Sequence, residues 1–505
     1  MHPTVFAKSA PDRLAYVMAG TGQAVTYREL DERSNQGAQL FRALGLRPGD
    51  GVAIMMENHP IYYEVLWAAQ RAGLRYTAVS SRLTAGEVEY IVSDSGAKAF
   101  IASQAMADVA LEVAARSQGV QLLMVDAALD PFASFEAERA KHPITPIPDE
   151  TPGGPMLYSS GTTGRPKGVH KPNAQAIGGF DAIYDRAVDK HICTGPAYHA
   201  SPLAGDIRRA LNNGVPTVLM DKWDTEFVLK TIQDQKVTRG HFVPIMFQRM
   251  LALPEEVRAK YDLSFLRRIT HGAAPCPPEV KRAMIEWLGP ILYEYYAGSE
   301  GGVGFTVTSE QWLARPGTVG RRPHKDAAKI LDDEGNECPP GVPGHIYLSL
   351  KDQGGFSYWK DDTKTYANRR GDYFTMGDIG YLDEDDWLFL TGRSAETIIA
   401  GGVNIYPQEI DNELIKHPAV EDSCCVGIPH EEWGEEVRAV IQLREGYEPS
   451  EELKREILDY AARVLAKYKV PRGIDFVDDL PRSEAGKIQR NKVRAPYWAG
   501  RSRAI

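Results

Sequence analysis

The sequence predicts an α/β protein with a large N-terminal domain of several lobes and a small α+β C-terminal domain. Strand patterns alternate with helical patterns over residues 26–103 and again over residues 195–303, which is typical of parallel sheets covered by helices. After Gly317 the strands become short and are interrupted by glycine, which indicates a small β-rich lobe. The N-terminal domain is therefore expected to contain two α/β lobes and one β-rich lobe.

The C-terminal domain is predicted from a change of pattern at Arg393. The residues after it, about 110 in number, have their own succession of strands and helices, and that length is enough for a separate domain. We therefore expect the two domains to span residues 1–393 and 394–505.

Helix-start signals and buried apolar runs define the first lobe. Thr26 and Glu29 have the spacing of a capping box, in which each side chain satisfies a backbone N–H group at the start of a helix, and Thr84 and Glu87 repeat this spacing. Two helices are expected to begin at these threonines. The other elements expected in this lobe are strands at 51–56, 74–79 and 98–101 and a helix at 60–72.

The second α/β lobe and the β-rich lobe are predicted in the same way. In the second lobe we expect strands at 215–220, 241–243, 266–270 and 291–295 and helices at 225–235, 244–252 and 278–287. In the β-rich lobe we expect strands at 328–331 and 344–349 and a hairpin formed by 379–382 and 387–390.

Composition excludes several classes of protein. The chain has 505 residues, of which 43% are hydrophobic and 25% charged, so large cores are feasible. A net charge of −10 argues against a nucleic-acid surface, which is usually basic. Without a signal-peptide pattern or an apolar run of roughly 20 residues, no membrane span and a cytoplasmic location are expected. The five cysteines lack metal-binding spacing, so we expect reduced thiols and no structural zinc.

A glycine-rich segment at 158–169 carries the strongest functional signal. It follows an apolar strand end, and its glycines and hydroxyl residues predict a loop. Backbone N–H groups in such a loop form an anion-binding concavity, which suits a polyphosphate, although the spacing differs from that of the common NTPase loop. A surface linker is the alternative. The candidate phosphate ligands are Ser159, Ser160, Gly161, Thr162, Thr163, Gly164 and Lys167.

This segment resembles the signature loop of the adenylate-forming superfamily, which includes acyl-CoA and aryl-CoA synthetases. Six motifs of this family occur in the family order between Tyr158 and Arg490. The resemblance implies an AMP-forming ligase that binds ATP and Mg²⁺. It also implies that residues 1–393 are the adenylation core and that residues 394–505 are a mobile, swivelling domain.

The next family segment surrounds the acid-binding pocket. A histidine at the position of His199 lies beside this pocket in the family, whereas a buried histidine with satisfied hydrogen bonds is the alternative. Asp206, Arg208 and Arg209 follow, although a pocket for a plain acyl chain should be apolar here. Arg208 or Arg209 is expected to pair with a polar substrate or with Asp206 itself, and a solvated helix face is the alternative.

Two motifs would bind the adenine side of the nucleotide. The segment 271–275 resembles one that lies flat against adenine, and its Gly272, Ala273 and Ala274 leave the backbone open to the ring. The segment 293–301 resembles the Tyr-Gly-x-Thr-Glu motif of the family. By this match Glu300 would hold Mg²⁺, which prefers one or two carboxylates together with phosphate oxygens. The other expected nucleotide-binding residues of this segment are Glu294, Tyr295, Tyr296, which would stack on adenine, and Ser299, which would contact phosphate.

The ribose site is expected at the β-hairpin of the β-rich lobe. Asp378 lies in a segment similar to the one whose aspartate accepts both ribose hydroxyls, and a carboxylate can accept two such bonds at once. Arg393, which follows the hairpin, matches an arginine that contacts ribose or phosphate. Ala395 stands where many relatives have Asp or Lys at the hinge between the domains, so the effect of this residue on domain rotation is open.

The last two motifs lie in the C-terminal domain. Gly401 and Gly402 match a stretch that lines the path of the incoming thiol after rotation. Lys487 matches the lysine that bridges the attacking carboxylate and the α-phosphate, where a cation is needed because both reactants are anions. Without the family match, Lys487 would be assigned to a basic surface patch.

The expected function is therefore activation of a carboxylic acid by ATP, followed by acyl transfer to coenzyme A. Lys487, His199, Glu300 and Asp206 are the candidate catalytic residues. An amide ligase is one alternative, in which Asp206 would orient or deprotonate an amine, and a non-catalytic nucleotide-binding protein is another. The segments 197–211, 241–246 and 298–303 should line the acid pocket and suit an aromatic, polycyclic or medium-chain acid equally well.

Overall fold

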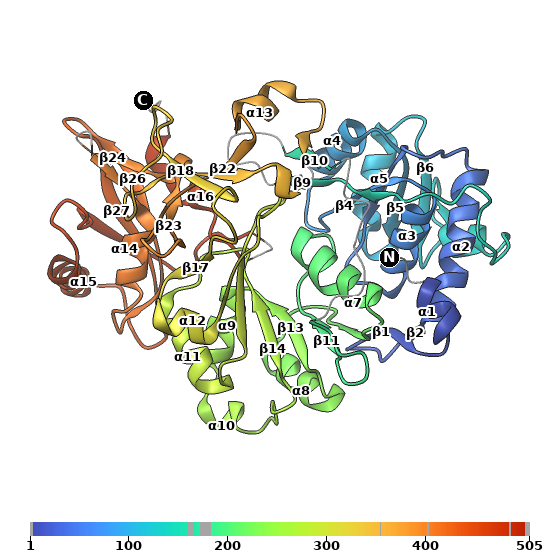
Figure 1. Cartoon of the computed structure of the whole chain (residues 1–505), viewed down its shortest axis with the longest axis horizontal. Coiled ribbons are helices and arrows are strands. Elements are labelled where there is room, and N and C mark those ends of the chain that lie inside the picture. The colour runs from blue at the N-terminus through green and yellow to red at the C-terminus, as the bar shows by residue number, and fades with distance from the viewer. Residues whose placement is uncertain are drawn as a thin grey trace. The chain divides into compact units, whose positions relative to one another are not determined.

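The computed structural model describes residues 4–159, 166–171, 183–353, 355–400, 403–483 and 486–499, apart from the side chains of Ser159 and Gln353. The chain, drawn in Figure 1 with colours that run from the N-terminus to the C-terminus, divides into two compact units. Unit 1 contains Met1–Phe242, Ala252–Thr270 and Lys351–Ala367, and unit 2 contains Val243–Leu251, His271–Leu350 and Asn368–Ile505.

A fully parallel sheet in unit 1 confirms the fold predicted for the first lobe. Its strands have the order β7-β6-β5-β3-β4-β8. They are β3 Gly51–Met55, β4 Arg75–Val79, β5 Ala97–Ser103, β6 Gln121–Val125, β7 Ala133–Ser134 and β8 Gly154–Pro155. The helices are α1 Thr4–Ser9, α2 Tyr27–Ala43, α3 Pro60–Arg71, α4 Ala85–Ser95, α5 Ala107–Arg116 and α6 Phe135–Arg139.

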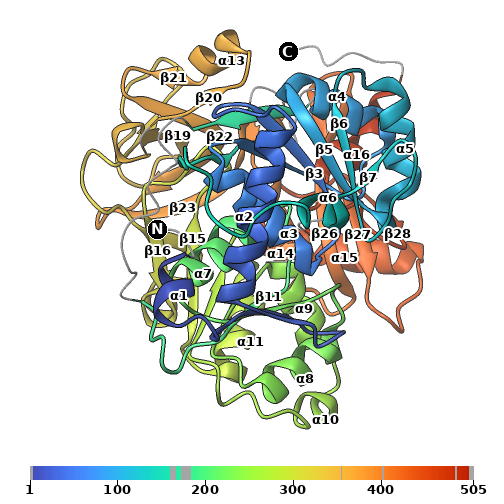
Figure 2. The same cartoon turned by 90° about the vertical axis from the view of Figure 1, so that its right-hand side faces the viewer.

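Helices cover both faces of this parallel sheet, and the side chains of each strand point alternately to the two faces. In β3, Val52 and Ile54 belong to a core shared with α2 and α3, whereas Ala53 and Met55 belong to a core shared with α4 and α5. Figure 2 shows α2 and α5 on opposite sides of the strands. The capping boxes predicted at Thr26 and Thr84 are both present, at the starts of α2 and α4.

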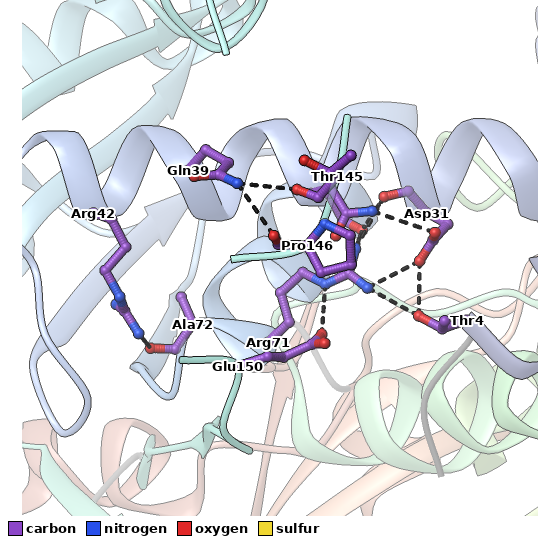
Figure 3. A network of polar contacts seen from close by, with 11 residues as sticks. Thr4, Asp31, Gln39, Arg42, Arg71, Ala72, Thr145, Pro146 and Glu150 are labelled. Carbon is purple, nitrogen blue, oxygen red and sulfur yellow. Dashed lines mark hydrogen bonds and ion pairs between the residues drawn. The ribbon is translucent and has the colours of Figure 1, made fainter. Parts of the chain in front are cut away.

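A buried arginine, Arg71, ties the helices of this lobe together (Figure 3). Its Nη2 donates to Thr4 Oγ1 and to Asp31 Oδ1, each at 2.9 Å, and its Nε lies 2.9 Å from Glu150 Oε1. Its Nη1 donates at 3.0 Å to the Asp31 carbonyl and to Ser34 Oγ. Every nitrogen of this guanidinium therefore has an acceptor.

The second sheet of unit 1 supplies the scaffold of the predicted acid pocket. Its strands lie in the order β14-β13-β11-β12-β1-β2. Strands β13, β11, β12 and β1 are parallel, and β2 at the edge is antiparallel to β1. They are β1 Leu14–Met18, β2 Ala24–Thr26, β11 His191–Cys193, β12 Thr217–Leu219, β13 Arg239–Phe242 and β14 Arg268–His271. The helices are a π-helix at Pro202–Arg208, α7 Arg209–Asn212, α8 Thr225–Gln235 and α10 Glu255–Arg258. A third, antiparallel sheet joins β9 Leu157–Ser159, β10 Lys167–His170 and β20 Ser357–Tyr358, and α13 Asp362–Ala367 follows.

Unit 2 contains the predicted β-rich lobe as an antiparallel sheet with the order β17-β23-β22-β19-β18. These strands are β17 Thr318–Arg321, β18 Ala328–Leu331, β19 Gly344–Ser349, β22 Tyr373–Leu382 and β23 Trp387–Arg393, with β21 Arg369–Arg370 beside β22. A hairpin of β15 Leu292–Tyr296 and β16 Phe305–Thr308 also belongs to this unit, as do α9 Pro244–Ala252, α11 Pro278–Leu288 and α12 Ser309–Ala314.

The chain after Arg393 forms the expected α+β structure, with helices packed on a sheet (Figure 1). Its strands have the order β25-β24-β27-β26, and β28 pairs with β27. They are β24 Ile398–Ala400, β25 Val403–Ile405, β26 Val420–His430, β27 Gly434–Leu443 and β28 Gly473–Val477, and the helices are α14 Pro407–Leu414, α15 Glu451–Val464 and α16 Arg490–Arg494. Among the residues described, no helix has the length and apolar character needed to cross a membrane.

Candidate active site

Part of the predicted phosphate loop lies outside the described residues, namely Ser160, Gly161, Thr162, Thr163 and Gly164. Its flanks are the antiparallel strands β9 and β10, in which Ser159 and Lys167 are cross-strand partners. Lys167 Nζ lies 3.1 Å from Asp361 Oδ2, and the hydrogen bond to this carboxylate raises the pKa of Lys167. The lysine is therefore held in its charged form at the end of the loop.

The segment predicted to face adenine has a constrained backbone in unit 2. Gly272 lies so close to Tyr295 that a Cβ atom here would be 2.8 Å from both the ring and the carbonyl oxygen of that residue. Ala273 has a φ of 68°, an uncommon value for a residue other than glycine, and Ala274 is partly buried. The backbone at residues 272–274 therefore lies close to strand β15, where a side chain at position 272 would not fit.

Glu294, in the same strand, has a partner that sequence reasoning missed. Lys281 Nζ lies 2.5 Å from Glu294 Oε2, and His271 Nε2 lies 3.9 Å from the same oxygen. Burial raises the pKa of Glu294, although Lys281 opposes this effect. Lys281 is on α11, and nothing in its local sequence distinguishes it from a surface lysine of an amphipathic helix.

Asp378 lies at the centre of the predicted nucleoside site. Asp378 and Arg393 are cross-strand partners in β22 and β23, and Arg393 Nε lies 3.0 Å from Asp378 Oδ1. Tyr296 donates a hydrogen bond of 2.6 Å from its hydroxyl to Asp378 Oδ2. Burial and then the Asp378 carboxylate raise the pKa of Tyr296 well above its usual value, so the phenol stays protonated. Each oxygen of Asp378 keeps a lone pair that can accept a ribose hydroxyl.

Lys487 shares the electrostatic environment of this cluster, although it lies 94 residues after Arg393 in the sequence. Loss of hydration and then the Arg393 guanidinium lower the pKa of Lys487, whereas Asp378 and Glu300 raise it. The lysine-bearing loop is closed by a hydrogen bond of 2.7 Å from the Ser483 N–H to the Lys487 carbonyl and by the left-handed Gly486. Lys487 therefore interacts electrostatically with Arg393, Asp378 and Glu300 within unit 2.

These groups fit the ligands that the sequence predicts. Within the described part of the chain no cluster of three or more His, Cys, Asp or Glu side chains could hold a metal by itself. The role that the sequence predicts for Glu300 needs no such cluster, because Mg²⁺ at a nucleotide takes most of its ligands from phosphate and water. Ser299 precedes it directly and is partly buried.

A second polar cluster surrounds Asp206 in unit 1. Asp206 is 2% exposed, and its Oδ1 lies 3.0 Å from His191 Nε2. Its Oδ2 lies 3.6 Å from His241 Nδ1, and His241 Nε2 lies 3.1 Å from Ser201 Oγ. Burial and then the neighbouring His191 lower the pKa of His241, although Asp206 opposes this effect. Sequence reasoning did not assign His191 or Ser201 to this cluster, since only the tertiary structure aligns β11, β13 and the π-helix.

The remaining candidate residues are in the pocket segment and the C-terminal domain. His199 lies beside Tyr198, with ring centroids 5.0 Å apart, and the hydroxyls of Tyr198 and Ser81 are 3.5 Å apart. Gly401 and Gly402 lie outside the described residues, and the strands before and after them pair with Ala400 opposite Val403.

Known families match most of the chain. Residues 4–353 match the family described as AMP-binding enzyme, and residues 409–487 match the AMP-binding enzyme C-terminal domain. The chain is 32% identical to the fatty acid–[acyl-carrier-protein] ligase ScoC of Streptomyces coeruleorubidus, over 96% of this chain and 94% of that protein. It is 31% identical to a feruloyl-CoA synthase of an Amycolatopsis species, over 98% of each. Among solved structures it is similar to ATP-bound MatB from Rhodopseudomonas palustris, with 27% identity, a TM-score of 0.84, and 98% and 99% of the two chains covered.

Proposed function

Because the chain belongs to the AMP-binding enzyme family, and with it to the adenylate-forming superfamily, we propose that it converts a carboxylic acid and ATP to an acyl-adenylate and pyrophosphate. It then passes the acyl group to coenzyme A. The observation that carries this proposal is the placement of the Asp378 carboxylate between Arg393 and Tyr296, in the unit that also contains Lys487 and Glu300. Two cations and two carboxylates from distant parts of the chain suit a nucleotide phosphate with its metal ion.

The first step is an in-line displacement at phosphorus. An oxygen of the substrate carboxylate attacks the α-phosphorus of ATP, and the bond from this phosphorus to the bridging oxygen breaks, so that pyrophosphate leaves with the electron pair. Lys487 neutralises the negative charge that builds up between the two anions. A bound Mg²⁺ held by Glu300 would add positive charge at the phosphates.

The nucleoside is held by the cluster around Asp378. Asp378 accepts the ribose hydroxyls, Arg393 contacts the ribose or the α-phosphate, and Tyr296 stacks on adenine beside residues 272–274. The hydrogen bond from Tyr296 and the ion pair with Arg393 support this assignment, because they hold both carboxylate oxygens of Asp378 in position before ATP binds. The loop residues 159–164 and Lys167 hold the β- and γ-phosphates.

The second step follows a rotation of the C-terminal domain, with the boundary at residues 393 and 394 and Ala395 at the hinge. The thiol sulfur attacks the acyl carbon and its proton passes to solvent, while the bond from this carbon to the phosphate oxygen breaks and AMP leaves with the electron pair. Gly401 and Gly402 line the path of the thiol. An amine acceptor is the alternative. In that case Asp206, which is paired with His191 and His241, would orient or deprotonate the amine.

Two measurements test the proposal. Acid-dependent exchange of labelled pyrophosphate into ATP, over a broad panel of acids, reports the first step. Mass spectrometry of the products formed with coenzyme A, with a pantetheine-bearing carrier protein and with amines then identifies the acceptor. An absence of exchange with every acid would contradict the proposed function and favour a non-catalytic nucleotide-binding protein.

A further inference from the structure

One buried arginine lacks the partners that the other buried arginines have. Arg208 is 4% exposed and ends the π-helix Pro202–Arg208. Its Nε and Nη2 are buried and have no hydrogen-bond acceptor among the residues that the structure describes, and no carboxylate there forms an ion pair with it. The other buried arginines of the described residues all have carboxylate partners: Arg71 with Asp31 and Glu150 (Figure 3), Arg139 with Glu64, and Arg490 with Asp411 and Glu396.

The surroundings of Arg208 contain further donors but no free carboxylate. The guanidinium carbon lies 6.0 Å from the ring centroid of Tyr76, and Tyr62, whose pKa is raised by burial and then by Tyr76 and Tyr198, also lies close to that ring. The Tyr62 hydroxyl is buried and likewise has no acceptor in the described part of the chain. Asp206, two residues before Arg208, forms ion pairs with His191 and His241, although its Oδ2 accepts no hydrogen bond from the described residues. The Arg208 N–H groups at Nε and Nη2 and the Tyr62 hydroxyl are therefore buried donors that have no acceptor among the residues that the structure describes.

This imbalance points to an anionic ligand. A guanidinium stays protonated in a protein interior, and a buried charge without a counter-charge is strongly unfavourable. A carboxylate accepts two parallel N–H bonds from such a group and has lone pairs left for a phenol. Arg208 lies in the segment 197–211 that is expected to line the acid pocket, so the acid substrate is the ligand that can supply this anion.

We propose that Arg208 binds a second carboxylate on the acid substrate, so that the enzyme selects a dicarboxylic acid and activates the carboxyl group remote from Arg208. This inference rests on the proposed function and specifies its substrate class. Tyr62 donates a further hydrogen bond to the same carboxylate. The exposed Arg209, which follows Arg208 directly in the sequence, has no part in this selection.

Matched acid pairs test the proposal, because each pair differs only in the second carboxylate. Adipate, suberate and terephthalate are compared with their monomethyl esters in the pyrophosphate exchange assay, using the wild type, Arg208→Met and the control Arg209→Met. In at least one pair we expect the wild type and Arg209→Met to prefer the diacid by about tenfold or more in kcat/KM, as for loss of a hydrogen bond to a charged group. Arg208→Met should reduce this preference to less than about threefold.

The outcomes separate this inference from the proposed function. Exchange with some acids, but without a diacid preference in the wild type, overturns the role of Arg208 and leaves the proposed function intact. The role of Arg208 is also overturned if Arg208→Met retains the diacid preference. It is likewise overturned if the KM of Arg208→Met for ATP rises with every acid, and this result would assign the anion to a nucleotide phosphate. The thermal melting curve shows whether Arg208→Met folds. If it does not, the test uses the wild type and Arg208→Lys instead. The inference is overturned if the wild type has no diacid preference, or if Arg208→Lys has the same preference as the wild type.

Discussion

The Tyr296 hydroxyl donates a hydrogen bond of 2.6 Å to Asp378 Oδ2, across 82 residues of sequence. Arg393 Nε lies 3.0 Å from the other oxygen, Oδ1. The carboxylate proposed to accept the ribose hydroxyls is therefore oriented from two sides. This arrangement gives Tyr296 a role in addition to stacking on adenine.

Replacing Tyr296 by phenylalanine should keep the ring and remove the hydrogen bond to Asp378. We expect the KM for ATP to rise by about tenfold, since a hydrogen bond to a charged group contributes about 1.5 kcal/mol or more. Steady-state exchange kinetics measure this change. Tyr381→Phe on strand β22 is the control, because Tyr381 is the cross-strand partner of Phe389 and its ring stacks on that residue at 5.0 Å; equal effects of the two variants would contradict the orienting role of Tyr296.

Removing the Lys487 side chain should slow adenylation by about a hundredfold or more, which corresponds to about 3 kcal/mol of barrier, because no other group would take its place between two anions. Single-turnover formation of the acyl-adenylate measures this step directly. Lys492→Ala, on the exposed part of α16, should leave the rate unchanged. An adenylation rate of Lys487→Ala within about threefold of the wild type would remove this residue from its proposed role.

The pH dependence of adenylation should report the charge of Lys487. The pKa of Lys487 is lowered by loss of hydration and by Arg393, so its positive charge is lost at a lower pH than for an ordinary lysine. The alkaline decline of the rate should therefore begin below the usual lysine range. Glu396 raises this pKa, so Glu396→Gln should move the decline to still lower pH, and a profile that does not move would contradict this assignment.

Gly486 tests whether the position of the lysine-bearing loop matters. Its φ is 75°, and a Cβ atom here would lie 2.3 Å from Ile245 Cγ2, so Gly486→Ala combines backbone strain with a clash. Gly446→Ala is the matched control, because its φ is 90° and nothing lies within 4 Å of the added atom.

Both substitutions should cost about 1 kcal/mol of stability through strain, but only Gly486→Ala should slow adenylation, by about tenfold or more. Thermal melting and single-turnover rates separate the two effects. If both variants adenylate at the wild-type rate, a displaced loop does not limit the reaction.

Elements with local signals were predictable from the sequence. Helices α8 and α9 begin and end at the predicted residues, and both predicted capping boxes formed, since a cap depends on residues three apart in the chain. The proximity of Asp378 and Arg393 could also be anticipated, because a predicted hairpin lies between them. In contrast, no short-range pattern indicated that Lys281 would pair with Glu294 or that Ser201 would contact His241.

The amino-acid sequence by itself determined the α/β architecture, the family and the order of the site motifs, because hydrophobic period, caps and turn residues act between near neighbours. Only the tertiary structure decided which polar groups are buried and what they face. Arg208 and Arg209 are identical and adjacent in the sequence, yet Arg208 is buried with no counter-charge among the described residues and Arg209 is exposed. Burial and pairing depend on segments far apart in the chain, such as β4 and the π-helix, and electrostatic energy depends on those distances and not on sequence neighbours.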